Sequence, residues 1–320
     1  MDFYFSEKIL KQLELSESEY IYKSSPTSIP HQLAMKHYDL VIIGTAHRYF
    51  NVFKEISDKY NTSVVVHNLN FTQLSRFELF KNLFKKDFYY RLKLLLKEGL
   101  LNAPKVYESA KHQLVLDEHL VKENLKFLPV FFNEFSQKTN NKNVTIVIPG
   151  AVSQSRRDYK MVLKKLMEFR RSKIALQNFQ IIFLGKASGL ELTELQSFEN
   201  ENQDIQIKYF KDKVPQSEFD FWMNKADFLW CPIQKQTEFF NNQEIYGLTK
   251  MTGNIGDAIK YAKNAIFPPN YSSPYPFIIN QEEDLWSQFQ VLKDKDFDRT
   301  TSFSKDNISM KLHQTLHLML

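Results

Sequence analysis

Short runs of β-branched and aromatic residues recur along the chain, and stretches with helical spacing of apolar residues separate them. The run 144–149, followed by the amphipathic stretch 159–170, is one example of this order. Such alternation is typical of a mainly parallel sheet covered by helices. The sequence therefore predicts an α/β fold. The expected strands lie near 19–23, 38–44, 63–68, 113–116, 127–131, 144–149, 180–185, 205–210, 227–232, 265–268 and 277–280.

The length of 320 residues suits two domains of roughly 150 residues each. The polar, turn-rich segment 137–142 separates two expected strands and marks a boundary. We expect an N-terminal Rossmann-like domain, 1–136, and a C-terminal one, 137–320. The only candidate for an opening strand is 3–5, which leaves open whether the N-terminal half is a complete or an incomplete Rossmann-like domain.

Composition excludes several classes of protein. No segment has the roughly 18 successive apolar residues of a spanning helix, and the first residues do not resemble a signal peptide. The single cysteine, Cys231, excludes an internal disulfide framework, which favours a cytoplasmic location. The net charge of +5 is mild, and no basic-aromatic module indicates nucleic acid binding. No histidine or carboxylate spacing indicates a metal site, and we predict none.

One segment, 76–97, combines seven basic residues with two acids and many aromatic and aliphatic residues. Two interpretations remain open. One is a pair of core helices with solvated lysines. The other is an amphipathic surface that meets an anionic membrane, at its inner face, or a lipid-linked acceptor.

A first anion-binding candidate follows the expected strand 144–149. Only eight glycines occur in the chain, and Gly150 and Gly185 both end expected strands. After Gly150 come Ser153, Arg156 and Arg157, just before a helical pattern. Backbone N–H groups at a helix start attract anions, and guanidinium groups match phosphate oxygens. The alternative is a solvated arginine pair that caps a surface helix.

A second candidate is the glycine-containing stretch 244–257. Lys250 is a compact cation suited to a diphosphate, and Thr252 and Gly253 precede a helical pattern whose N–H groups attract anions. The alternative is a long surface loop with a solvated lysine. We expect the two loops to converge on one diphosphate within the C-terminal domain. The candidate residues of this stretch are Glu244, Tyr246, Gly247, Lys250, Thr252, Gly253 and Asp257.

The order of segments in the second half resembles that of GT-B glycosyltransferases, especially the family 4 type. The segments that carry the resemblance are 144–157, 180–186, 214–219, 226–233 and 257–266. The resemblance implies two Rossmann-like domains facing across a cleft. It also implies transfer of a sugar from a nucleotide-diphosphate donor, held by the C-terminal domain, to a glycan or lipid-linked acceptor, as in cell-surface polysaccharide synthesis. No cofactor and no metal would be needed.

The resemblance also implies roles for individual residues. Arg156, Arg157 and Lys250 would neutralise the diphosphate, and Thr252 and Gly253 would donate hydrogen bonds to it. Asp257 would bind the ribose and Glu244 would lie near the donor sugar, although their spacing is longer than that of the two glutamates of the family.

An inverting reaction needs a general base near the acceptor hydroxyl. The candidates are His67 and His47, each of which follows an expected strand. Two other functions remain open: a nucleotide-sugar epimerase of the same architecture and a nucleotide-sugar binding protein without catalysis.

Overall fold

The computed structural model describes residues 1–320 except 86, 135–142, 172–178 and 297–300. The chain forms two compact units, which we call unit 1 and unit 2. Unit 1 comprises Met1–Val130, Glu238–Met251 and Met310–Leu320, and unit 2 comprises Phe131–Thr237 and Thr252–Ser309. The expected boundary at 136/137 lies outside the described residues. The continuous C-terminal domain expected over 137–320 is wrong, because two late segments belong to unit 1.

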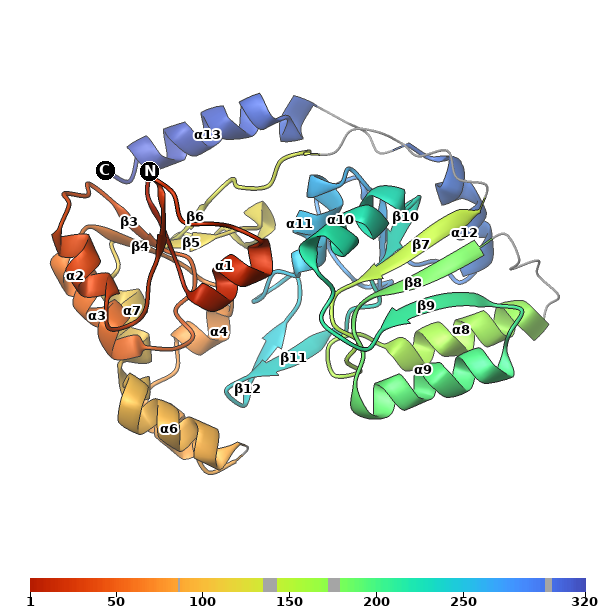
Figure 1. Cartoon of the computed structure of the whole chain (residues 1–320), viewed down its shortest axis with the longest axis horizontal. Coiled ribbons are helices and arrows are strands. Elements are labelled where there is room, and N and C mark those ends of the chain that lie inside the picture. Colours follow the sequence, from red (N-terminus) through yellow and green to blue (C-terminus); the bar gives the residue numbers. More distant parts are fainter. Residues whose placement is uncertain (86, 135–142, 172–178, 297–300) are drawn as a thin grey trace. The chain divides into compact units, whose positions relative to one another are not determined.

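Unit 2 is built on a six-stranded sheet in the order β14-β13-β10-β7-β8-β9, and the neighbouring strands are parallel (Figure 1). Its strands are β7 (Val144–Pro149), β8 (Phe179–Lys186), β9 (Gln206–Phe210), β10 (Phe228–Trp230), β13 (Ala265–Phe267) and β14 (Ile278–Asn280). Counted within the unit, this is the 3-2-1-4-5-6 order of a Rossmann fold. The order reverses between β7 and β10, and the expected α/β class is confirmed.

Amphipathic helices bury one face each in the core of unit 2. In α8, Tyr159, Val162 and Leu166 are buried and join the same apolar cluster as Phe183 and Trp230 of the sheet. Burial of this apolar area is the main stabilising contribution to such a layer. The helices of the unit are α8 (Tyr159–Arg171), α9 (Gly189–Glu201), α10 (Gln216–Lys225), α11 (Gly253–Lys260) and α12 (Leu285–Asp294), with the short η4 (Thr301–Phe303).

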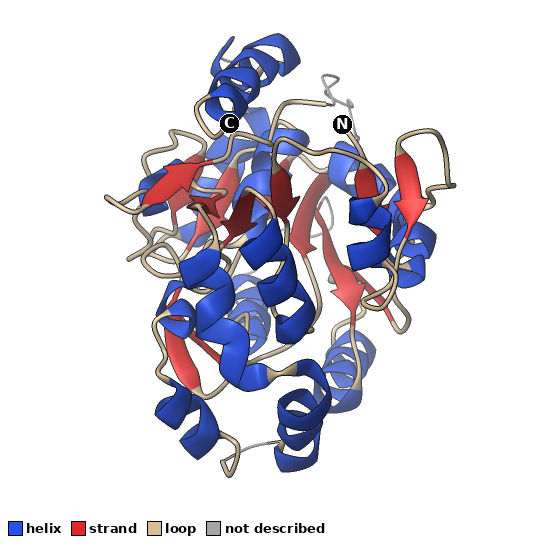
Figure 2. Cartoon of the chain, turned by 90° about the vertical axis from the view of Figure 1, so that its left-hand side faces the viewer, coloured by secondary structure: helices blue, strands red, loops and turns tan. Residues whose placement is uncertain are grey.

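Unit 1 contains a four-stranded parallel sheet in chain order, β3 (Val41–Ile43), β4 (Thr62–Val65), β5 (His112–Val115) and β6 (Leu125–Phe127). A separate parallel pair joins β1 (Phe3–Phe5) to β2 (Ile21–Lys23). Helices lie beside these strands (Figure 2). They are α1 (Glu7–Leu13), α2 (Ile29–Ala34), α3 (Phe50–Lys59), α4 (Leu69–Thr72), α5 (Arg76–Asn82), α6 (Phe88–Glu98) and α7 (Ala103–Ser109), with η1 (Leu100–Asn102) and η2 (Glu118–Leu120).

A hairpin that the sequence analysis did not predict connects β11 (Gln236–Phe239) and β12 (Asn242–Ile245). Its two turn residues, Phe240 and Asn241, both have positive φ, as a type I′ turn requires. The Phe240 ring is buried 5.4 Å from the ring of Phe71 and lies beneath the Arg91 guanidinium at 5.2 Å. This docking explains why the segment from Glu238 onward belongs to unit 1.

The last helix, α13 (Lys305–His317), begins in unit 2 and ends in unit 1. Near its end, Met319 is fully buried against Val65 and Leu114 of the four-stranded sheet. Among the helices within the described ranges, none combines the length and the apolar character required to span a membrane.

Candidate functional site

In unit 2, two loops meet where the strand order reverses. The loop after β7 pairs with the loop after β10 through an antiparallel bridge between Arg157 and Ile233. The Asp158 N–H donates to the Pro232 carbonyl at 2.7 Å, and the Gln234 N–H donates to the Arg156 carbonyl at 2.9 Å. These bonds fix the arginine-containing loop at the carboxyl ends of the strands, the edge at which doubly wound sheets bind ligands.

Glycine permits close approach at this edge. Gly150 has φ +102°, and a Cβ there would lie only 2.3 Å from Nη2 of Arg157. At Gly185, the end of β8, a Cβ would lie 2.2 Å from the Gly150 carbonyl oxygen. Both positions exclude a side chain, so the guanidinium group can lie directly against the end of β7.

Asn254 connects the arginine to the start of α11. Its Oδ1 accepts from Arg157 Nη2 at 3.2 Å, and its Nδ2 donates to the Pro149 carbonyl and to Asp257 Oδ2, both at 3.2 Å. Asn254 is almost fully buried. The bridging role of its side chain was not predicted from the sequence, although the Thr-x-Asn pattern at a helix start could have indicated it.

The electrostatics of this cluster suit an anion. Thr252 is the N-cap of α11, and its Oγ1 accepts from the Asn254 N–H at 3.4 Å. Burial raises the pKa of Asp257 to about 6, although Asn254, Arg157 and Lys260 oppose the rise. Within the described residues, the buried Nε of Arg157 has no hydrogen-bond partner. A guanidinium group and a helix N-terminus together form a recognised kind of phosphate site.

The other donor-site candidates of unit 2 lie in the loop after β7, near the end of β8 and at the start of α11. Arg156 and Gly253 are exposed, and the Ser153 hydroxyl lies 2.9 Å from that of Ser155. Unit 2 therefore contains these candidates: Gly150, Ser153, Arg156, Arg157, Gly185, Thr252, Gly253 and Asp257.

The remaining candidates of the stretch 244–257 lie in unit 1, so the expectation that Lys250 shares a lobe with the arginines is wrong. The chain turns tightly here: Gly247 has φ +82°, its N–H donates to the Lys250 carbonyl at 2.9 Å, and Tyr246 forms a bridge with Lys250. The Thr249 carbonyl accepts a hydrogen bond at 2.9 Å from the N–H of Leu69, the first residue of α4, and this bond holds the turn.

Glu244 also caps α4. Its carboxylate accepts from the backbone N–H groups of Phe71 at 3.0 Å and Asn70 at 3.4 Å. The side chain is fully buried, and this burial raises its pKa against the opposing effect of these hydrogen bonds and of Lys250. The geometry thus gives Glu244 a structural contact in unit 1.

Two histidines lie at the carboxyl ends of β3 and β4. Nε2 of His67 is 2.8 Å from the Gly44 carbonyl, so this nitrogen carries the proton and Nδ1 is left as the base. The Lys250 ammonium donates to Oδ1 of Asn68, whose Nδ2 lies 3.1 Å from Nε2 of His47. The Asn68 amide therefore donates to His47, and Nε2 of that ring accepts.

Both imidazoles are held neutral. Burial lowers the pKa of His47 to about 4, helped by the nearby His67 ring and Lys250 ammonium. Burial also lowers the pKa of His67, although its contact with the Gly44 carbonyl opposes the shift. A neutral imidazole at neutral pH can accept a proton, which is the property a general base needs.

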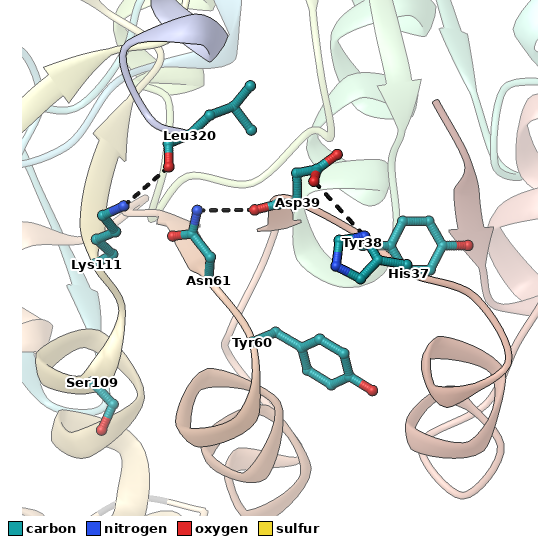
Figure 3. Close-up of a pocket in the computed structure, with 8 residues that line it drawn as sticks. All are labelled: His37, Tyr38, Asp39, Tyr60, Asn61, Ser109, Lys111 and Leu320. Carbon is teal, nitrogen blue, oxygen red and sulfur yellow. Dashed lines mark hydrogen bonds and ion pairs between the residues drawn. The ribbon is translucent and has the colours of Figure 1, made fainter.

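An open hollow of about 650 Å³ lies beside the unit 1 sheet, at the end of the strands opposite to the two histidines (Figure 3). Its lining comes from residues that precede β3, β4 and β5, such as Asp39, Asn61 and Lys111. Lys111 donates to the Leu320 carbonyl at 3.4 Å and Asn61 donates to the Asp39 carbonyl at 2.9 Å. The hollow lies at the amino ends of the strands, away from both histidines.

In the part of the chain that the structure describes, no three His, Cys, Asp or Glu side chains are grouped to hold a metal ion. No protein-family model and no curated protein matches the sequence.

Solved structures do match. UDP-GlcNAc 2-epimerase from Methanocaldococcus jannaschii is 13% identical and aligns with a TM-score of 0.52, over 98% of this chain and 89% of that one. A UDP-forming trehalose-phosphate synthase from Burkholderia xenovorans is 9% identical, with a TM-score of 0.52 over 92% and 76%. The N-terminal domain of trehalose-6-phosphate phosphatase from Candida albicans is 8% identical, with a TM-score of 0.51 over 92% and 73%. At these identities the likeness shows the fold: two Rossmann-like units of the GT-B kind.

Proposed function

We propose that the protein is a glycosyltransferase that moves a sugar from a nucleotide-diphosphate donor to a glycan or lipid-linked acceptor, in cell-surface polysaccharide synthesis. One observation carries the proposal. The Arg157 guanidinium, the Asn254 amide and the N-terminus of α11 lie together at the point where the strand order of a Rossmann sheet reverses.

The chemistry follows from these groups. A departing nucleoside diphosphate gains negative charge, and fixed guanidinium and N–H donors stabilise that charge without rearrangement. We propose that no metal and no cofactor takes part. In unit 1, the neutral His67 is the proposed base for the acceptor hydroxyl, through its Nδ1.

The proposed location is the cytoplasm, with contact to the inner face of a membrane through the segment 76–97. The basic and aromatic composition of that segment supports this contact.

The donor site is tested by thermal unfolding with UDP, GDP, ADP, CMP and dTDP. A nucleotide at one hundred times its Kd stabilises the protein by about 2.7 kcal/mol. We expect at least one to do so, and Arg157→Ala to abolish the effect, because the guanidinium would face the diphosphate. Arg171→Ala, an exposed arginine at the end of α8, is the matched control and should respond as the wild type does. If no nucleotide stabilises the wild type, the proposal fails.

A second candidate function is nucleotide-sugar epimerisation, because an epimerase aligns over 98% of this chain. The two reactions differ in their products. An epimerase converts UDP-GlcNAc without an acceptor and keeps the sugar on the nucleotide, whereas a transferase releases the nucleoside diphosphate only when an acceptor is present. Analysis of both products by anion-exchange chromatography separates the two.

A further inference from the structure

Helices α5 and α6 divide their side chains between the core of unit 1 and solvent. Leu79 and Leu94 are fully buried. On the other side, Phe77, Phe84 and Tyr89 are 74%, 64% and 87% exposed. Exposed apolar groups of this size gathered in one place mark an interaction site. We call the exposed set the α5–α6 face; its members are Phe77, Phe80, Phe84, Phe88, Tyr89, Tyr90 and Leu96.

Four rings of this face are in contact in series. Phe80 and Phe84 have ring centroids 5.5 Å apart, Phe84 and Phe88 5.8 Å, and Phe88 and Tyr89 5.7 Å. The aromatic strip therefore continues from α5 into α6, and Figure 1 shows α6 at the margin of unit 1.

The two helices and the junction between them also carry exposed basic side chains. Among the described residues of the two helices and their junction, the exposed bases are Arg76, Lys81, Lys85, Lys93 and Lys97. The exposed acids are fewer: Glu78 is engaged in the capping box with Ser75, and Asp87 precedes α6. Lysine is depleted in protein–protein interface cores, whereas aromatic rings beside lysines suit an anionic lipid surface.

Packed side chains connect the α5–α6 face to the carboxyl ends of β3 and β4, where His47 and His67 lie. Arg91 of α6 donates to the Asn82 carbonyl at 2.6 Å and its guanidinium lies over the Phe240 ring. The Phe240 ring lies 5.3 Å from that of Phe239, which lies 4.5 Å from the His47 ring. A continuous packed path thus runs from the helix that carries the face to the carboxyl ends of β3 and β4.

We propose that the α5–α6 face inserts its rings into the interface of an anionic bilayer, with its lysines among the lipid phosphates. This names the lipid class and the inserting residues for the membrane contact in the proposed function, on which it rests. It fixes unit 1 at the bilayer while the rest of the fold stays in water.

The test is flotation of the protein with phosphatidylcholine vesicles and with mixed phosphatidylcholine–phosphatidylglycerol vesicles. We expect binding to the mixed vesicles only. The triple variant Phe77→Ser/Phe84→Ser/Tyr89→Ser should bind at least about tenfold more weakly, since three inserting rings are lost. Replacing Lys81 or Lys85 by glutamine should weaken binding about fivefold for each lysine.

The matched control is Phe221→Ser, which removes a 55% exposed ring from α10 in unit 2 and should leave binding unchanged. Equal binding to both vesicle types, absence of binding, or a triple variant that binds as the wild type does would each overturn the proposal. Self-association that the triple variant abolishes, without vesicle binding, would overturn it in favour of a protein interface. Nucleotide stabilisation, measured on the same variants, reports on the donor site in unit 2 independently of the bilayer.

Discussion

The starts of α4 in unit 1 and α11 in unit 2 form an informative pair. At α4, the N–H groups of Leu69, Asn70 and Phe71 are bonded to Thr249 and Glu244 of the same chain. At α11, the cap is a neutral hydroxyl, from Thr252, and the neighbouring Asn254 is bonded to the Arg157 guanidinium and to the Asp257 carboxylate.

The two helix starts use the same physical property in different ways. The partial positive charge of a helix N-terminus attracts an anion in both units. Unit 1 supplies that anion itself, as a buried carboxylate, and the capped end stabilises its fold. Unit 2 places a cation there, which increases the attraction for an external anion.

The largest expected effect is in unit 1. Glu244→Ala leaves the buried Phe71 N–H and the partly buried Asn70 N–H without their acceptor, so we expect the free energy of unfolding to fall by about 4 kcal/mol. Urea unfolding followed by circular dichroism measures it. Glu244→Gln keeps one acceptor oxygen and should lose less than half as much. A Glu244→Ala protein as stable as the wild type would remove the contrast between the two helix starts.

Acidification should destabilise unit 1 through His47 and stabilise unit 2 through Asp257. His47 has a folded pKa of about 4 against an ordinary value of 6.5, so its neutral form stabilises the fold. This contribution is present above pH 6.5 and is lost as the pH falls towards 4. Asp257 has its pKa raised to about 6 from 3.8, so its ionised form costs stability above pH 6, and acidification relieves that cost. Each contribution is about 3 kcal/mol.

The measurement compares unfolding at pH 7 and at pH 4.5 for His47→Gln and Asp257→Asn. His47→Gln should lose less stability than the wild type on acidification, and Asp257→Asn should lose more. All three tryptophans, Trp222, Trp230 and Trp286, lie in unit 2, so fluorescence reports on that unit. Variants whose pH dependence matches the wild type would contradict the burial of these two groups.

The smallest effect concerns the cap of α11. Thr252→Ala removes the hydroxyl that accepts from the Asn254 N–H, which should cost about 1 kcal/mol of unfolding free energy. Thr252→Ser keeps the hydroxyl and should behave as the wild type does. The tryptophan signal in a urea titration measures both variants, and a loss as large as that of Glu244→Ala would show that the two helix starts are equally important to the fold.

The strands of both units were predictable, because β-branched runs such as 144–149 and 62–65 are buried on both sides and carry a strong local signal. The arginine loop was predictable for the same local reason, since it follows a strand and a glycine. The hairpin was not. Phe240 and Asn241 lack glycine at the turn, and the docking of Phe240 depends on residues more than 140 positions earlier. The assignment of Lys250 to the wrong lobe followed directly from that omission.

Unit 1 is assembled from three stretches of chain, with the whole of 131–237 between the first and the second. During synthesis on a ribosome, Glu244, which caps α4, and Met319, which packs on the four-stranded sheet, emerge long after the N-terminal strands. The N-terminal sheet of the nascent chain therefore remains incomplete, and the start of α4 remains uncapped, until the later residues have been synthesised. Unit 2 has most of its strands in one continuous stretch, so its closure should precede the final closure of unit 1.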